Sequence, residues 1–192
     1  MRKPAIIVAA CVLLNGCTAV WTTGEVPFVP TPFEVVDRML EMAEVKKVDV
    51  VYDLGSGDGR IVIRAAKKYG ARGVGIEIDR PLVDLSRAKA RDAGVAHLVE
   101  FYEQDALNVD LSQATVVTLY MLPEFNARLR PILAQQLKPG ARVVSHDFDI
   151  EGWVPSKVEK ITGGWLHQHA IYLWRMEGKE QNNDDSVKGA PK

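Results

Sequence analysis

The residues best suited to chemistry in this chain run from 53 to 60, Asp-Leu-Gly-Ser-Gly-Asp-Gly-Arg, directly after an apolar run. Glycine adopts positive φ easily and has no Cβ, so the backbone through Gly55, Gly57 and Gly59 can turn sharply and lie against a flat adenosyl group. A dinucleotide-binding fingerprint requires its third glycine one position later, where this chain has Arg60. The spacing therefore predicts a nucleotide-binding loop and disfavours a dinucleotide as its ligand.

Carboxylates also stand at the ends of two later apolar runs. Glu77 ends the apolar run 73–78, where a carboxylate can accept hydrogen bonds from both hydroxyls of a ribose. Asp105 follows the run 98–102 in the same way. The alternatives are a surface carboxylate at Glu77 and a turn or capping role for Asp105 before Leu107.

The acidic residue two places before the first glycine, here Asp53, and the Gly-x-Gly-x-Gly spacing resemble motif I of the class I S-adenosylmethionine-dependent methyltransferases. The resemblance implies S-adenosylmethionine as cofactor, with the glycine loop near its methionine and adenosyl parts. It also implies that Glu77 accepts from the ribose and Asp105 from the adenine amino group. The residues assigned to the cofactor are Asp53, Gly55, Ser56, Gly57, Gly59, Glu77 and Asp105.

A narrower resemblance rests on Pro30-Thr31-Pro32, on the loop 53–60 and on Arg142-Val143-Val144-Ser145. Together these segments resemble a family of membrane-associated protein-lysine methyltransferases, whose mitochondrial members modify the c-type ring protein of ATP synthase and the adenine nucleotide translocase. The resemblance covers roughly residues 26–155 and implies a membrane-associated protein substrate with lysine as the acceptor. Two alternatives stay open: a small-molecule or lipid methyltransferase, and a lipid-anchored binding protein that keeps the nucleotide fold without transfer activity.

The acceptor side is expected where the fourth and fifth strands end. The fourth ends in Tyr120-Met121-Leu122-Pro123-Glu124 rather than Asn-Pro-Pro-Tyr, which departs from enzymes that methylate amino groups of adenine, cytosine or glutamine. We predict that Tyr120 lines the methyl-transfer channel, with ordinary strand-end packing as the alternative. Asp147, with His146, is the nearest candidate to accept a proton, and Trp153 is a candidate for the channel wall. A polar strand end is the alternative for this segment.

Metal and thiol chemistry are not expected in the folded part. His167 and His169 lie two apart and face the same way in a predicted strand. Without a carboxylate or cysteine at ligand spacing, such a pair is more typical of a hydrogen-bonded strand face than of a zinc site, so no metal site is predicted. Both cysteines, Cys11 and Cys17, precede the folded part.

Apolar runs and helical patterns alternate along the rest of the chain. This rhythm predicts an α/β fold with a doubly wound, mostly parallel seven-stranded sheet and an antiparallel C-terminal edge strand, the Rossmann-like methyltransferase fold. A first helix should begin at Thr31, with Thr31 and Glu34 forming a capping box, and Pro131 should kink or divide the last helix. The expected strands are 48–54, 73–78, 98–102, 115–120, 141–148, 158–161 and 165–176, and the expected helices include 60–69, 81–93 and 123–137.

Composition limits the chain to one domain with ordinary partners. A chain of 192 residues with 47 % hydrophobic content buries one core of ordinary size. Lys+Arg at 24 against Asp+Glu at 25 gives a net charge of -1 without a basic block, which argues against nucleic acid as a partner. The expected divisions are a signal or lipoprotein-type segment 1–17, a linker 18–30, the methyltransferase domain 31–176 and a disordered polar tail 177–192.

The N-terminal segment is typical of an export signal. Arg2 and Lys3 precede an apolar run over 5–14, too short to span a bilayer, which takes roughly 20 apolar residues. Leu14-Asn15-Gly16-Cys17 resembles the lipobox of bacterial lipoproteins, in which the cysteine is lipidated. This pattern predicts a membrane-associated protein on the periplasmic side, held by the N-terminal segment or by a lipid on Cys17. It conflicts with a cofactor found in the cytosol, and a segment that packs on the domain is the alternative.

Overall fold

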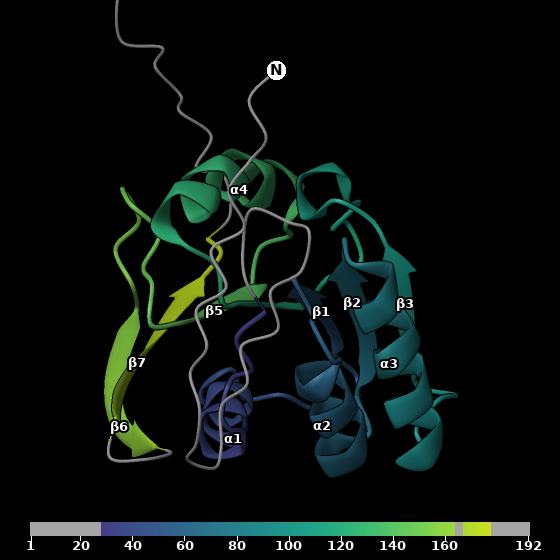
Figure 1. The fold of residues 1–192 in the computed structure, drawn as a ribbon. Helices are drawn as coiled ribbons and strands as arrows, with labels where there is room; N and C mark the ends of the chain where they lie inside the picture. Colours follow the sequence, from purple (N-terminus) through teal and green to yellow (C-terminus); the bar gives the residue numbers. More distant parts are fainter. Residues whose placement is uncertain (1–27, 164–166, 178–192) are drawn as a thin grey trace, which may run out of the picture.

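A computed structural model describes residues 28–163 and 167–177 of the chain. They form one seven-stranded sheet in the order β3-β2-β1-β4-β5-β7-β6, flanked by helices on both faces (Figure 1). The strands are β1 Val50–Leu54, β2 Arg72–Glu77, β3 Val99–Glu103, β4 Val116–Leu119, β5 Arg142–His146, β6 Lys157–Gly163 and β7 His167–Arg175. The helices are α1 Phe33–Met42, α2 Arg60–Tyr69, α3 Arg80–Asp92, α4 Pro123–Gln136 and the short 3₁₀ helix η1 Ala106–Asn108.

The pairing of the strands confirms the predicted doubly wound fold. Strands β1 to β5 pair in parallel, whereas β7 pairs antiparallel with both β5 and β6. The strand order reverses between β1 and β4, and in sheets of this kind a ligand binds beyond the carboxyl ends of the strands at that switch point. The topology therefore places the glycine loop, which follows β1, at the expected binding edge.

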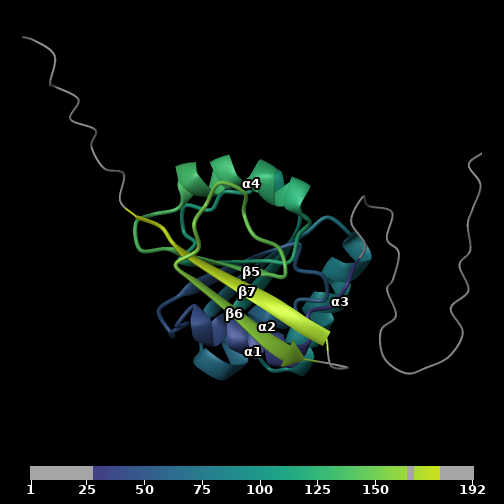
Figure 2. The same ribbon diagram turned by 90° about the vertical axis from the view of Figure 1, so that its left-hand side faces the viewer.

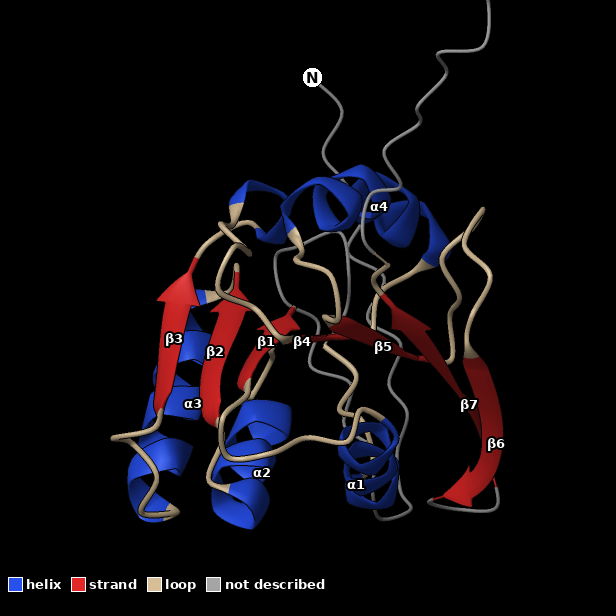
Figure 3. Cartoon of the chain, turned by 180° about the vertical axis from the view of Figure 1, so that it is seen from behind, coloured by secondary structure: helices blue, strands red, loops and turns tan. Residues whose placement is uncertain are grey.

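Two apolar layers cover the sheet, one on each face. Helices α1, α2 and α3 pack on one face, and α4 with η1 packs on the other, as the edge-on view shows (Figure 2). Successive strand residues alternate between the layers, so that Val143 joins the α4 side and Val144 the α1 side. Burying each such side chain stabilises the fold by about 1.5–3 kcal/mol. Seen from behind, the helix layers leave the carboxyl ends of β1 and β4 beneath α4 (Figure 3).

The predicted capping box at the start of α1 is wrong. The N-cap is Pro32, whose side chain has no acceptor, and the Thr31 hydroxyl lies 3.2 Å from Nδ1 of His146 instead. Thr31 is therefore fixed by a contact with a residue 115 positions away rather than by its own helix.

Pro131 does not divide α4, contrary to one of the two predicted outcomes. The helix runs unbroken from 123 to 136 with Pro131 inside it. The ring faces solvent, while Leu129 and Leu133 on either side are fully buried. Packing of these two leucines compensates for the lost backbone hydrogen bond.

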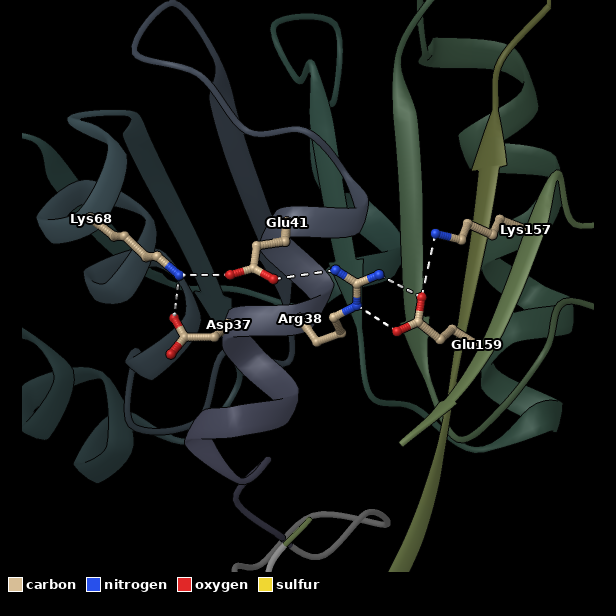
Figure 4. Close-up of polar contacts among 6 residues, drawn as sticks. All are labelled: Asp37, Arg38, Glu41, Lys68, Lys157 and Glu159. Atoms are coloured by element: carbon tan, nitrogen blue, oxygen red, sulfur yellow. Dashed lines mark hydrogen bonds and ion pairs between the residues drawn. The ribbon is translucent and has the colours of Figure 1, made fainter. Parts of the chain in front are cut away.

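An ion-pair network joins α2, α1 and β6 across the outside of the fold (Figure 4). Arg38 of α1 donates through Nε and Nη2 to the two carboxylate oxygens of Glu159, at 2.5 and 2.6 Å. This bond, more than any other interaction, lowers the pKa of Glu159 to about 2. The members of the network are Asp37, Arg38, Glu41, Lys68, Lys157 and Glu159. Because these groups are partly exposed, each pair contributes at most about 1 kcal/mol.

None of the helices in the described part of the chain has the length and apolar character needed to cross a membrane.

Candidate active site

A cavity of about 610 Å³ opens at the carboxyl ends of β1, β2 and β4. This volume falls within the range of about 300–1,000 Å³ typical of small-molecule sites. One end is lined by the glycine loop and by acidic side chains, the other by aromatic and aliphatic ones. Lining residues include Phe28, Thr31, Asp53, Gly55, Ser56, Asp58, Glu77, Asp105, Tyr120, Met121, Leu122, Phe125 and Phe148.

The three glycines of the loop all have positive φ, at 76°, 54° and 77° for Gly55, Gly57 and Gly59. A Cβ on Gly57 would lie 2.2 Å from Cε2 of Phe28, and one on Gly59 would lie 2.6 Å from Cε1 of Phe101. Both the backbone conformation and the space therefore require glycine. Gly59 is also the N-cap of α2, so the loop leads directly into a helix N-terminus.

Asp53 is buried at the end of β1, where its side chain is 3 % exposed. Its Oδ1 accepts a hydrogen bond of 2.6 Å from the hydroxyl of Thr118 on β4. Burial nevertheless raises the pKa of Asp53 to about 7, with smaller contributions from the nearby carboxylates Glu77 and Asp58. A buried acid in this state strongly favours a cationic partner.

Glu77 is buried at the end of β2 and holds the glycine loop in place. Its Oε2 accepts from the N–H of Gly57 at 2.8 Å, and its Oε1 accepts from the N–H groups of Ile78 and Asp79 at 2.8 and 3.0 Å. Each carboxylate oxygen can accept two hydrogen bonds, so Oε2 keeps one acceptor position. Glu77 is therefore not a surface carboxylate.

Asp105 lines the cavity and also caps η1. Its Oδ1 accepts from the N–H of Leu107 at 2.9 Å, which is the capping role considered as the alternative. Lining the cavity and capping the helix are compatible, because the second oxygen faces only a long contact of 3.4 Å from the Asn108 amide.

Arg60, which replaces the third glycine of a dinucleotide fingerprint, ties the loop to the segment before α1. It donates from Nε and Nη2 to both oxygens of Asp58 at 2.8 Å and from Nη1 to the carbonyl of Thr31 at 2.8 Å. Burial alone would raise the pKa of Asp58, but the hydrogen bonds from Arg60 and Lys89 outweigh burial and hold it below its usual value. The sequence analysis missed this link.

The end of the predicted linker belongs to the cavity. Phe28, Val29 and Pro30 all line it, and the ring of Phe28 lies directly over Gly57. The only sequence signal for this role was the segment Pro30-Thr31-Pro32, which carried the family resemblance but gave no position in space. The predicted signal segment and Cys17 lie outside the described residues.

At the other end of the cavity, Tyr120 lies over His146. The two rings are 4.0 Å apart, and the ring of Phe148 stacks 6.1 Å from that of Tyr120. Of the described residues, Tyr120 and Phe148 line the cavity whereas Asp147 and His146 do not. Burial lowers the pKa of His146 to about 4, so its imidazole is neutral at physiological pH. The structure thus separates the two residues predicted to carry catalysis, Tyr120 and Asp147.

Asp147 instead faces β7. Its Oδ1 accepts from the N–H of Ala170 at 2.9 Å, and its Oδ2 lies 3.3 Å from Nδ1 of His169. Trp153, predicted as a wall of the channel, packs against Trp174 with ring centroids 6.3 Å apart and belongs to the core on the α4 side.

Comparison with known proteins decides what the loop and cavity belong to. The family model described as the ANTKMT methyltransferase domain matches residues 53–157, more than half of the chain. The chain belongs to this family. The methyltransferase is 46 % identical over 150 residues to a protein-lysine N-methyltransferase of Saccharolobus islandicus, an alignment that covers 78 % of this chain and 92 % of that relative.

Two further matches support the family and the fold. The human lysine N-methyltransferase named for the C-type subunit of ATP synthase is 35 % identical over 151 residues, covering 78 % of this chain and 64 % of that protein. A crystal structure named as an RNA methyltransferase from Salinibacter ruber, in complex with S-adenosyl-L-homocysteine, matches with 55 % identity and a TM-score of 0.75, covering 83 % of this chain and all of that one. The chain is therefore an S-adenosylmethionine-dependent methyltransferase, as its glycine loop predicted.

Proposed function

We propose that the chain transfers a methyl group from S-adenosylmethionine to the side-chain amine of a lysine in a membrane-associated protein. The cavity carries this proposal, because one end is acidic and lined by the glycine loop while the other is aromatic and apolar. The names of the Saccharolobus and human relatives, which are lysine N-methyltransferases, support the acceptor. The human relative, named for a component of ATP synthase, supports the class of protein substrate.

We assign cofactor binding to the glycine-loop end of the cavity. Residues there fit the group: Asp53 is a buried acid suited to a cation, and the buried hydroxyl of Ser56 has no hydrogen-bond partner within the described residues. Bound S-adenosylmethionine supplies a methyl group on a sulfonium, which is an electrophile. The residues assigned to this role are Asp53, Gly55, Ser56, Gly57, Gly59, Glu77 and Asp105.

The aromatic end suits an amine that must lose its proton. A lysine amine has a reference pKa of about 10.4, so presenting it neutral near pH 7.4 costs about 4 kcal/mol. Surroundings such as Tyr120, Met121 and Phe148 lower that cost because they disfavour the ammonium. Alignment of the amine with the methyl group then provides most of the acceleration. Because Asp147 does not line the cavity, a role for it as the proton acceptor stays a prediction.

The test is methyl transfer from isotopically labelled S-adenosylmethionine to three acceptor fractions in parallel: membrane proteins, total RNA and extracted lipids. Methyl-lysine in hydrolysates of the membrane proteins is the expected product. Label in RNA would agree with the name of the Salinibacter structure and overturn the lysine acceptor. Label in lipid would favour a small-molecule or lipid methyltransferase. Calorimetric binding of the cofactor without transfer to any fraction would favour a binding protein.

Two tyrosine variants sharpen this test. Tyr120→Ala removes the ring that lines the aromatic end, and we expect at least a tenfold loss of transfer with cofactor affinity unchanged. Tyr102→Ala removes a tyrosine that is 45 % exposed on β3 and should change neither quantity. Equal transfer by Tyr120→Ala and the unsubstituted chain would remove Tyr120 from the acceptor side.

We also propose that the N-terminal segment exports the protein and anchors it through a lipid on Cys17. The support is the charged pair Arg2 and Lys3, the apolar run over 5–14 and the segment Leu14-Asn15-Gly16-Cys17. Incorporation of a labelled fatty acid should be lost in Cys17→Ala and retained in Cys11→Ala. Equal labelling of the two variants, or none in the unsubstituted chain, would contradict the anchor.

A further inference from the structure

Three potential metal ligands converge where β5 meets β7. His146 ends β5, Asp147 follows it, and His169 lies on β7. Nε2 of His146 lies 2.9 Å from Nδ1 of His169 and 3.2 Å from Oδ2 of Asp147, and the last two atoms are 3.3 Å apart. Two imidazole nitrogens and a carboxylate oxygen thus form a nearly equilateral triangle.

The size of this triangle matches the face of a metal coordination sphere. A tetrahedral ion with ligands at about 2.0–2.1 Å separates neighbouring ligand atoms by about 3.3 Å. The three observed separations, from 2.9 to 3.3 Å, lie close to that value. Two histidines and one carboxylate are also an established ligand set for zinc and for non-haem iron(II).

Each of two ligands is oriented by a partner on its other side. Nδ1 of His146 lies 3.2 Å from the Thr31 hydroxyl, which turns Nε2 toward the shared point. Oδ1 of Asp147 accepts from the N–H of Ala170 at 2.9 Å, which turns Oδ2 the same way. Partners of this kind are typical of metal sites, where they fix ring orientation and ligand basicity.

The backbone at Asp147 also serves this convergence. Asp147 has φ 59°, a left-handed conformation that non-glycine residues adopt rarely and that is concentrated at functional sites. This turn directs the carboxylate across to β7 instead of along β5. His146 and His169 are 0 % and 7 % exposed, so the three atoms meet in a largely dry space where an ion gains most from its ligands.

We propose that His146, Asp147 and His169 bind a divalent transition-metal ion, of the zinc and iron(II) class, between β5 and β7. The ion lies behind the cavity wall, because the ring of Tyr120 covers that of His146 and Thr31 contacts both the cavity and the site. Its role is to hold β7 against β5 and to fix the position of Tyr120. Sequence reasoning compared His169 with His167, whereas the fold joins His169 to a residue 23 positions earlier.

The test is titration of the full chain with Co²⁺, after chelator treatment and without an affinity tag that binds metals. We expect one Co²⁺ per chain with visible ligand-field bands, and elemental analysis of the untreated protein should identify the native ion. His169→Ala should weaken Co²⁺ binding at least tenfold. His167→Ala is the matched control, because its exposed imidazole lies two residues away on the same strand, and it should bind like the unsubstituted chain.

Two outcomes would overturn the proposal: absence of Co²⁺ binding by the unsubstituted chain, or equal binding by His169→Ala. Asp147→Asn decides the matter if His169→Ala fails to fold, because an asparagine oxygen can still accept from Ala170 while losing the ligand charge. Zn²⁺ should also raise the Tm of the unsubstituted chain and of His167→Ala but not of Asp147→Asn. An equal rise in all three would assign the effect to adventitious binding.

Discussion

The two ends of the cavity are assembled from the chain in different ways. At the glycine-loop end, Asp53 and the glycines are contiguous, and Glu77 reaches Gly57 from the adjacent strand, 20 positions away. At the β5–β7 end, His146 meets Thr31 and His169 across separations of 115 and 23 positions. The first end is encoded by spacing, so it is legible in the sequence. The second depends on strand order, so its residues carry little meaning until the sheet has formed.

The strongest way to break the glycine-loop end is Gly59→Ala. The added Cβ would meet Phe101 and Ser86 at 2.6 Å, and the residue would be held at φ 77°. We expect a loss of about 2–5 kcal/mol in the free energy of unfolding, from left-handed strain and overpacking together, with loss of activity. Urea denaturation measures the change.

Gly94→Ala separates the two causes. Gly94 has a similar φ of 71°, but nothing lies within 4 Å of the position of its Cβ. This variant should lose only about 1–2 kcal/mol. Equal losses in the two variants would mean that crowding around Gly59 contributes nothing.

The next largest effect is expected from Asp53→Asn and is a dependence on pH. The pKa of Asp53 is raised to about 7 in the folded chain and lies near 3.8 when unfolded, so the folded state binds the proton more tightly. The contribution of Asp53 to stability is complete below pH 3.8 and is lost as pH rises toward 7. Between pH 5 and 7.5 the unsubstituted chain should therefore lose roughly 2–3 kcal/mol relative to Asp53→Asn.

The measurement is urea denaturation of both proteins across this pH range. The neutral His146, whose pKa is lowered to about 4, contributes in the opposite direction but equally to both proteins. Asp92→Asn removes a carboxylate from an exposed position on α3 and should track the unsubstituted chain. A constant difference between Asp53→Asn and the unsubstituted chain would contradict the raised pKa.

A smaller effect, confined to cofactor binding, is expected from Glu77→Ala. Removing this carboxylate leaves three backbone N–H groups without their acceptor and should weaken S-adenosylmethionine binding by about 1–3 kcal/mol. Glu103→Ala is the matched control, because Glu103 pairs in register with Glu77 but its side chain is 48 % exposed. Calorimetric titration that finds the same affinity for both variants would remove Glu77 from the site.

The smallest effect is expected from the surface network of Figure 4. Glu159→Gln should lower the free energy of unfolding by only about 0.2–1 kcal/mol at pH 7, and by less at high salt. The pKa of Glu159 is lowered to about 2, so this contribution is present above the usual pKa and lost as pH falls toward 2. Glu151→Gln, at an exposed turn, should change stability less, and denaturation at two salt concentrations compares the two.

Much of the fold was predictable because local patterns and core packing agree. Helix 60–69 was predicted to the residue, since Gly59 and Gly70 bound an apolar pattern and both have positive φ. The predicted antiparallel C-terminal edge is confirmed by the pairing of β7 with β5 and β6. The capping box failed because Thr31 is satisfied by His146, a contact that local sequence does not encode.

By itself, the sequence determined the family, the cofactor and the binding edge. Glycine is the only residue that tolerates positive φ with backbone, ring and ligand in close contact, so the spacing at 55, 57 and 59 has a nearly unique structural meaning. Tertiary structure decided what surrounds that loop: Phe28 over Gly57, Arg60 on Thr31, and the triangle of His146, Asp147 and His169. Those contacts join residues far apart in the chain, and the order of the strands in the sheet brings them together.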